Sequence, residues 1–370
     1  MNFRKYISSF FSDVKQFVAY REVLGVDIGT VSVKAVHVKR VGERVVLENY
    51  ALLETKEYLD RGNAAIQTSS LKIVERDTAE LLRTLVREMH ATTVNAIASI
   101  PMFGVFVVPI ELPLVSFEET ERLLGFQVRQ YLPLQLEEVN LEWVKLDEFD
   151  TPRGVRYQRL LITAVPLSTI RTHQAVFKAA GLKLVGLEIE TQALTRALLS
   201  PADPPTMILD IGGESTSISI IEHGNARRTG QSEYGGAALT QTVARTLGIS
   251  ASRAEELKRR RGLKTSQGEY DLSTSLTPFL DAILEECRRV AAAYERDTHI
   301  AVERLMIVGG GANLAGLTEY CAAQTGFKIQ TPFPFARVEY PPVLEPAMKA
   351  LSSEFAVALG LGRKFFETQK

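Results

Sequence analysis

The stretch VLGVDIGTVSVKAV, residues 23–36, decides the fold. It reads as an apolar strand that ends in Asp27, a glycine turn with small hydroxyl residues, and a second strand. The same order returns in TMILDIGGESTSISIIEHG, residues 206–224, where Asp210 corresponds to Asp27. A single Asp-x-Gly turn occurs in many ordinary hairpins, but two copies about half a chain apart indicate a duplicated structural unit.

The residue types in both turns suit a phosphate group. A glycine lets backbone N–H groups approach phosphate oxygens without a side chain in the way, and hydroxyl groups add donors. Lys34, on the strand that leaves the first turn, has the reach to contact β- and γ-phosphates as a point charge. The expected nucleotide contacts in the two turns are Asp27, Gly29, Thr30, Ser32, Lys34, Asp210, Gly212, Gly213, Ser215 and Thr216.

The two aspartates also predict a metal. Asp27 and Asp210, one from each copy, are expected to face each other across a cleft, where two carboxylates repel each other unless a cation lies between them. We therefore expect Mg2+ at Asp27 and Asp210, held mainly through water. For either aspartate alone, a turn residue that bonds its own backbone is an adequate alternative, but this alternative does not predict the pair.

Two further stretches are candidates for the rest of a nucleotide pocket. RAEELKRRRG, residues 253–262, places Glu255 and Lys258 on one helical face, where they suit ribose hydroxyls and a base; a solvated surface pair is the alternative. LMIVGGGANLAGL, residues 305–317, reads as a strand, three glycines and the start of a helix at Asn313, although a plain strand-to-helix turn stays open. The glycines are Gly309, Gly310 and Gly311.

Composition bounds the class of protein. The chain has 370 residues, 45% of them hydrophobic, and a formal charge of -1, so a sizeable core with two or more subdomains is expected and no nucleic acid partner is indicated. The two cysteines and five histidines form no metal-type cluster and read as reduced thiols and isolated imidazoles. Without an apolar run of about 18 residues or a signal-peptide core, we expect a cytoplasmic protein.

The order of predicted elements gives the domain organisation. Strands at 23–28, 31–39, 44–52 and 94–100, with a helix at 77–91, form an opening β-β-β-α-β unit. Residues 104–182 then read as a β-α-β-β-α insert, in which Ser116 caps a helix with Glu119 and Gly181 ends the last one. The expected boundaries are a first lobe at 21–103, the insert at 104–182, a return to the first lobe at 183–204, a second lobe at 205–343 and a C-terminal helix at 344–370 that returns to the first lobe.

Residues 1–20, MNFRKYISSFFSDVKQFVAY, form a separate amphipathic pattern. Their apolar residues recur at three- and four-residue steps, which draws one apolar stripe on a helix. Three interpretations stay open: a helix docked on the body of the same protein, a helix that lies on a membrane surface or a partner, and a disordered segment.

These motifs together resemble the actin-like ATPase superfamily and, within it, the PilM family of type IV pilus assembly proteins, which is related to the cell-division protein FtsA. GVDIGTVSVKAV is similar to the first phosphate loop of the family, LDIGGEST to the second, and IVGGGANLAGL to the adenosine loop. EYGGAALTQTVA, which contains Gly235 and Gly236, and the insert stretches IPMFGVFVVPIELP and QYLPLQLEEVNLEW also resemble PilM. The resemblance covers residues 22 to 365 and rests on the ordered set of motifs.

The resemblance implies an α/β protein with an actin-like two-lobed ATPase fold, built from duplicated ribonuclease H-like units with a small inserted α+β subdomain. It implies ATP with Mg2+ between the lobes, and Glu190 at the place where related chaperones carry the acid that orients the attacking water. Glu214 stands where many relatives have a small residue, and this difference is expected to affect the hydrolysis of ATP more than its binding.

The resemblance also implies a role and its alternatives. The implied role is a cytoplasmic scaffold, peripheral at the inner membrane, that binds the N-terminal tail of a PilN-like membrane protein and self-associates into a ring or filament. An FtsA-like cell-division protein or another actin-like filament protein is the nearer alternative. A phosphotransferase similar to sugar kinases is the more distant one, because such an enzyme needs a further catalytic carboxylate near a deep substrate cleft.

Overall fold

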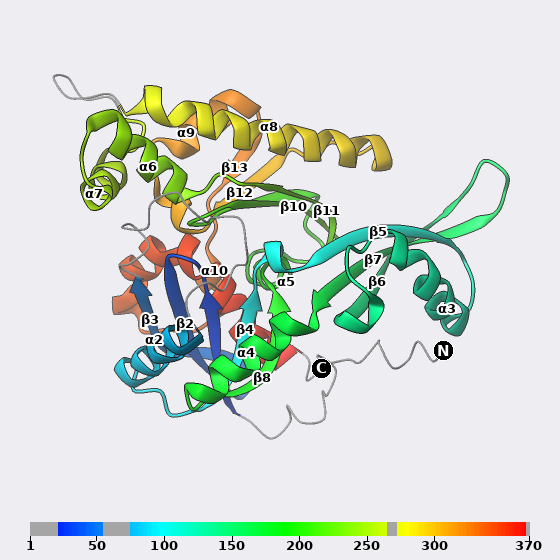
Figure 1. Cartoon of the computed structure of the whole chain (residues 1–370), viewed down its shortest axis with the longest axis horizontal. Coiled ribbons are helices and arrows are strands. Elements are labelled where there is room, and N and C mark those ends of the chain that lie inside the picture. Colours follow the sequence, from blue (N-terminus) through cyan, green and yellow to red (C-terminus); the bar gives the residue numbers. More distant parts are fainter. Residues whose placement is uncertain (1–20, 55–74, 265–271, 368–370) are drawn as a thin grey trace.

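The computed structural model of the chain describes residues 21–54, 75–264 and 272–367, and contains three β-sheets with helices around them (Figure 1). The amphipathic pattern predicted at 1–20 lies outside the described residues. Within the described part, no helix is both long and apolar enough to cross a membrane.

The first lobe is built on a five-stranded sheet with the order β3-β2-β1-β4-β8. Its first three strands pair antiparallel as consecutive hairpins, and β4 and β8 add in parallel, which confirms the predicted β-β-β-α-β opening. Strand β4 is buried along its whole length, as expected for a central strand that is covered on both faces. The elements are β1 Glu22–Ile28, β2 Ser32–Val41, β3 Arg44–Glu54, α2 Glu75–Glu88, β4 Asn95–Ile100, β8 Lys183–Ile189 and α5 Glu190–Leu198.

The second lobe repeats this topology in a sheet with the order β11-β10-β9-β12-β13. Again three antiparallel strands come first and parallel strands follow, so the duplication inferred from the two Asp-x-Gly turns extends to the whole sheet. The elements are β9 Thr206–Ile211, β10 Thr216–Glu222, β11 Asn225–Ser232, α6 Gly236–Leu247, α7 Ala251–Arg261, α8 Ser273–Thr298, β12 Arg304–Val308, α9 Leu317–Thr325 and β13 Lys328–Gln330.

A small separate sheet with the order β5-β7-β6 forms the insert. Its elements are β5 Phe106–Pro113, α3 Phe117–Gln127, β6 Val139–Asp150 and β7 Arg156–Pro166. The predicted capping box is present, since the Ser116 hydroxyl accepts from the backbone N–H of Glu119 and the Glu119 carboxylate accepts from that of Ser116. The insert has its own apolar core, in which Leu112, Leu124 and Leu160 are almost fully buried.

Helix α4, Leu167–Ala179, packs against α2 and β8 of the first lobe. Its buried residues Ile170 and Phe177 belong to the apolar cluster of that lobe, together with Leu82 of α2. We therefore propose that the insert ends at Pro166, where β7 ends, and that α4 is part of the first lobe. Gly181, predicted to end this helix, follows it with a φ of +79°, a conformation that favours glycine.

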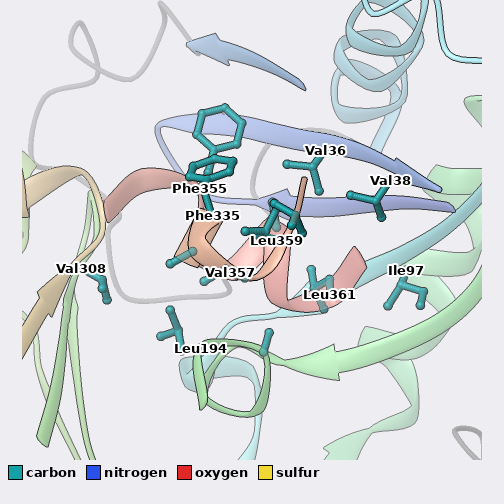
Figure 2. Packing of buried hydrophobic residues seen from close by; sticks show 14 of the residues in the cluster. Val36, Val38, Ile97, Leu194, Val308, Phe335, Phe355, Val357, Leu359 and Leu361 are labelled. Atoms are coloured by element: carbon teal, nitrogen blue, oxygen red, sulfur yellow. The ribbon is translucent and has the colours of Figure 1, made fainter. Parts of the chain in front are cut away.

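Helix α10, Glu345–Glu367, lies across the first lobe and also contacts the second. It packs on β1, β2 and α5, and its Phe355 belongs to one apolar cluster with Val36 of the first sheet and Val308 of β12 (Figure 2). Glycines permit this close packing: a Cβ atom on Gly360 would lie 1.9 Å from the backbone oxygen of Ala193. The remaining short 3-10 helices are η3 Met102–Gly104, η4 Val128–Gln130, η5 Leu136–Glu138, η6 Gly310–Asn313, η7 Pro334–Arg337 and η8 Pro342–Leu344.

Candidate functional site

The two Asp-x-Gly turns have the same backbone geometry. The N–H of Gly29 donates to the carbonyl of Ser32 at 3.0 Å, and the N–H of Gly212 donates to that of Ser215 at 2.9 Å. In each lobe the turn joins the first strand of the sheet to the second, so the aspartate lies at the end of a buried strand. The sequence repeat is therefore a repeat of local structure.

The two turns lie against each other. A Cβ atom on Gly213 would lie 2.0 Å from Val31 Cγ2 and 2.9 Å from Thr30 Oγ1, across the boundary between the lobes. Because only glycine leaves room for this approach, the backbone of the second turn packs directly against the side chains of Val31 and Thr30 in the first turn. The structure thus brings together the two loops that the sequence predicted to share a ligand.

Asp27 is held in place from both sides. Its Oδ2 lies 3.2 Å from Lys34 Nζ, the residue paired with it in register on β2, and its Oδ1 accepts a hydrogen bond from Ser99 Oγ at 2.9 Å. Burial is the largest single effect on Lys34 and opposes its charge, but the carboxylates of Asp27, Asp210 and Glu354 together outweigh burial, so the pKa of Lys34 is raised. Ser99 was not predicted from the sequence; the available signal is a hydroxyl group within the fully buried strand β4.

Asp210 faces the same region from the second lobe. Burial, and then the negative charge of Asp27, raise the pKa of Asp210 to about 6, while Lys34 acts in the opposite direction. The third loop also approaches this carboxylate: Gly309 has a φ of +82°, and a Cβ atom there would lie 2.4 Å from Asp210 Oδ1. A glycine is therefore required at 309 both for its backbone conformation and for space.

Glu190, at the start of α5, is the third acidic group in this region. Its Oε2 accepts a hydrogen bond from the backbone N–H of Met102 at 3.3 Å. Burial raises the pKa of Glu190 well above its ordinary value, and the charges of Asp27 and Asp210 raise it further. Three carboxylates from three different elements therefore interact in one place.

This set of groups fits a magnesium-bound polyphosphate. Lys34 is the positive charge that acts on Glu190 and Asp210, and a single ammonium group cannot neutralise three carboxylates. A divalent cation would therefore relieve their mutual repulsion. Within the described residues no group of three His, Cys, Asp or Glu side chains is arranged to hold a metal directly. An ion that keeps most of its waters and takes one or two carboxylates suits this arrangement, and Mg2+ prefers such sites.

The helix α7 supports the loop at 235–236. Lys258 Nζ donates to the carbonyl of Gly236 and to Thr240 Oγ1, both at 2.8 Å, and forms an ion pair with Glu255 at 2.6 Å. Lys258 is only 8% exposed, so the alternative of a solvated surface pair is wrong. Arg259 continues the chain of ion pairs to Glu54 of the first lobe at 2.7 Å.

The loop at 235–236 is in turn tied to the second turn. The N–H of Gly236 donates to the carbonyl of Gly212 at 2.9 Å, and a Cβ atom on Gly235 would lie 2.5 Å from the backbone nitrogen of Ser215. Thr216 is buried and its hydroxyl donates to the carbonyl of Tyr234 at 2.7 Å, so this side chain holds the loop rather than facing outward.

The third glycine loop differs in detail from the prediction. Residues Gly310–Asn313 form a 3-10 turn, and α9 begins only at Leu317, so the expectation that Asn313 starts a helix is wrong. Leu314 leaves the turn in an extended conformation and Gly316 has a φ of +85°, so the chain is interrupted between the 3-10 turn and α9. Asn313 Nδ2 donates to Glu354 Oε1 of α10 at 2.6 Å, and a Cβ atom on Gly311 would meet the side chain of Ile211.

Comparison with known proteins agrees with this geometry. Residues 25–366 match the model of the family described as type IV pilus assembly protein PilM. Over 250 residues, or 64% of the chain, it is 22% identical to the cell division proteins FtsA of Enterococcus faecalis and Enterococcus hirae. The matched region spans 57% and 56% of these two relatives, so the chain covers little more than half of their length.

Solved structures share the fold. The chain resembles a chain of the PilM-PilN type IV pilus biogenesis complex with a TM-score of 0.78 and 22% identity, covering 93% of this chain and 98% of that one. It also resembles the ethanolamine utilization protein EutJ from Carboxydothermus hydrogenoformans, with a TM-score of 0.54, 19% identity and coverage of 92% and 88%. MreB5 of Spiroplasma citri, solved with ADP, gives a TM-score of 0.53 at 14% identity with coverage of 94% and 97%. The predicted actin-like two-lobed fold is confirmed.

Proposed function

Because the chain belongs to the PilM family of type IV pilus assembly proteins, we propose that it is an ATP-binding scaffold of the pilus assembly platform at the inner membrane. The observation that carries the proposal is the pair of opposed glycine turns, with Asp27, Lys34 and Asp210 gathered where they meet. Neither a structural hairpin nor a plain protein-binding module needs buried carboxylates from two lobes beside one lysine.

In this proposal the phosphates of ATP lie between the two turns. Backbone N–H groups of the turns at 29–32 and 212–215 bind phosphate oxygens, and Lys34 adds a positive charge. Asp27 and Asp210 would hold Mg2+ mainly through water, and the ion would supply charge neutralisation. The loops at 235–236 and 309–313 and the helix with Glu255 and Lys258 border the nucleoside.

Glu190 is the proposed acid that orients an attacking water. Burial and the charges of Asp27 and Asp210 raise the pKa of Glu190, so the positive charge of a bound cation would favour the ionised carboxylate that a base needs. We propose at most slow hydrolysis, with the nucleotide state acting on partner affinity.

The proposed partner is the N-terminal peptide of a PilN-like inner-membrane protein. A similar solved structure is described as a PilM-PilN complex. The small insert, with its own sheet and core, is the proposed receiving element. Recruitment through such a partner gives peripheral attachment at the cytoplasmic face of the membrane, and copies of the scaffold are proposed to associate into a ring or filament.

An FtsA-like role in cell division is the second candidate, since the chain is 22% identical to FtsA proteins over 250 residues. The two roles differ in the membrane partner. Co-purification from solubilised membranes, with and without Mg-ATP and with partners identified by mass spectrometry, therefore tests the proposal. A PilN-like protein whose recovery changes with Mg-ATP supports the pilus scaffold; recovery of division proteins instead, or of no membrane protein, contradicts it.

A further inference from the structure

Two adjoining cavities lie along α8 in the second lobe, and neither contains a residue of the nucleotide loops. The first, of about 310 Å³, lies between α8 and β11, and the second, of about 360 Å³, continues from there to the insert. Arg228 of β11 lines both, so the two cavities adjoin at this residue, and we call the pair the arginine groove. In the sheet of the second lobe, β11 is an edge strand.

The first cavity is positively charged. Among its lining residues are Arg228, Arg289 and Arg296, around a floor that includes Ala292 and Ala293, and none of the lining residues is acidic. Arg228 pairs with Asp297 and Arg289 pairs with Glu286 at the margins.

Other charged groups act on Arg228 at this place. Burial lowers the pKa of Arg228, and the nearby positive charges of Arg159 and Arg296 lower it further. Glu111 acts in the opposite direction, and both Glu111 and Asp297 line the second cavity, so the excess of positive charge lies in the first cavity. An anionic group that enters the first cavity would be attracted by the three guanidinium groups.

The second cavity contains an unsatisfied buried donor. Tyr294 of α8 lines it and is fully buried, and its hydroxyl makes no hydrogen bond of ordinary geometry to a described residue, although burial and then the nearby Glu222 carboxylate raise its pKa to about 12. A buried polar group without a partner is unusual in native proteins and indicates that a ligand or solvent group completes it. On the opposite wall, Tyr131 of the insert is 49% exposed.

The walls of the groove are held in place by ion pairs between the insert and the second lobe. Asp147 of β6 pairs with Arg159 of β7 and with Arg227 of β11, and Arg227 also pairs with Glu222 at 2.8 Å. These side chains are largely removed from solvent, which fixes the position of the insert relative to β11. The groove is therefore a formed feature of the two units.

We propose that the arginine groove binds an acidic segment of a protein partner, with carboxylates at Arg228, Arg289 and Arg296 and one acceptor at the Tyr294 hydroxyl. A peptide suits the site better than a small ion, because two adjoining cavities combine guanidinium groups with apolar surface and tyrosine rings. This surface is separate from the nucleotide loops, and the inference does not depend on the proposed function.

The test uses a short fluorescein-labelled peptide of alternating glutamate and alanine, with a glutamine-for-glutamate peptide as its control, and measures fluorescence anisotropy. The full chain is expected to bind the acidic peptide with an affinity that falls as the salt concentration is raised, and not to bind the control peptide. The double variant Arg289→Glu/Arg296→Glu is expected to lose about tenfold or more in affinity. The matched variant Arg87→Glu, an exposed arginine of α2 in the first lobe, is expected to bind as wild type does.

Tyr294→Phe separates a binding role from a structural one. Because the hydroxyl makes no hydrogen bond of ordinary geometry and lies near the Glu222 carboxylate, its removal is expected to leave the thermal unfolding temperature unchanged or higher, and yet to weaken peptide binding several-fold. Equal binding by wild type and the double arginine variant, or no salt-sensitive binding of the acidic peptide, overturns the proposal. So does binding only to phosphatidylserine vesicles that depends on the same arginines, since the groove would then be a lipid site.

Discussion

Replacing Asp210 with asparagine should change how the stability of the nucleotide-free protein depends on pH. The pKa of Asp210 is about 6 in the folded protein and 3.8 without the fold, because burial and the charge of Asp27 disfavour its ionisation. Because the pKa of this group is higher in the folded state than in the unfolded state, its contribution to stability is fully present at pH values below the unfolded-state pKa. The contribution is lost as the pH rises through the folded-state pKa. Wild type should therefore lose stability between about pH 4 and pH 6 that Asp210→Asn does not lose.

The size of this loss follows from the two pKa values. A separation of 2.2 units, 6 minus 3.8, corresponds to roughly 3 kcal/mol at 1.36 kcal/mol per unit, and the partial exposure of Asp210 makes this an upper bound. Thermal unfolding of both proteins in EDTA, across pH 4 to 8, measures it. The variant should gain stability relative to wild type as pH rises, and Mg-ATP should reverse the loss in wild type alone. Parallel profiles for the two proteins would show that Asp210 does not lie in a buried acidic cluster.

Three further predictions concern hydrolysis, packing and the partner. Glu190→Gln should lower any measured ATPase rate while nucleotide affinity is kept; an unchanged rate removes Glu190 from that role. Gly360→Ala should lower the free energy of unfolding by about 1–3 kcal/mol, because its Cβ would lie 1.9 Å from the Ala193 backbone oxygen; urea denaturation that shows no loss contradicts the close approach of α10 to α5. Deleting residues 2–18 should leave co-purification with the membrane partner intact. Removing residues 106–166, the insert, should abolish co-purification while circular dichroism shows that the fold is kept. The opposite pattern would make the N-terminal segment the anchor.

Local sequence patterns were sufficient for the hairpins that carry the site. In each lobe the apolar strand, the glycine turn and the next strand lie within one continuous stretch, so the geometry around Gly29 and Gly212 follows from neighbouring residues. The capping box at Ser116 is equally local, since its two hydrogen bonds join residues three apart. Such features depend on spacing and are visible in a single sequence.

The missed features are contacts between residues far apart in the chain. Ser99 donates to a carboxylate 72 positions away, and buried Glu188 accepts from Lys364 at 3.0 Å across 176 positions and from Arg196 at 2.5 and 2.7 Å. No periodicity in one sequence specifies which distant partner fills such a site. The packing of α4 on the first lobe was missed for the same reason, because a helix that follows β7 directly reads as part of the insert.

The measurement that tests the central claim most directly is Mg-ATP binding by isothermal titration calorimetry, with wild type, Lys34→Ala and Lys39→Ala. Lys34 pairs with Asp27 in the proposed phosphate site, whereas Lys39, on the same strand, pairs with Glu48 at the surface and serves as the matched control. We predict several-fold or greater weakening for Lys34→Ala, wild-type affinity for Lys39→Ala, and an intact fold for both by circular dichroism. Equal ATP affinity in all three proteins would contradict the proposed nucleotide site.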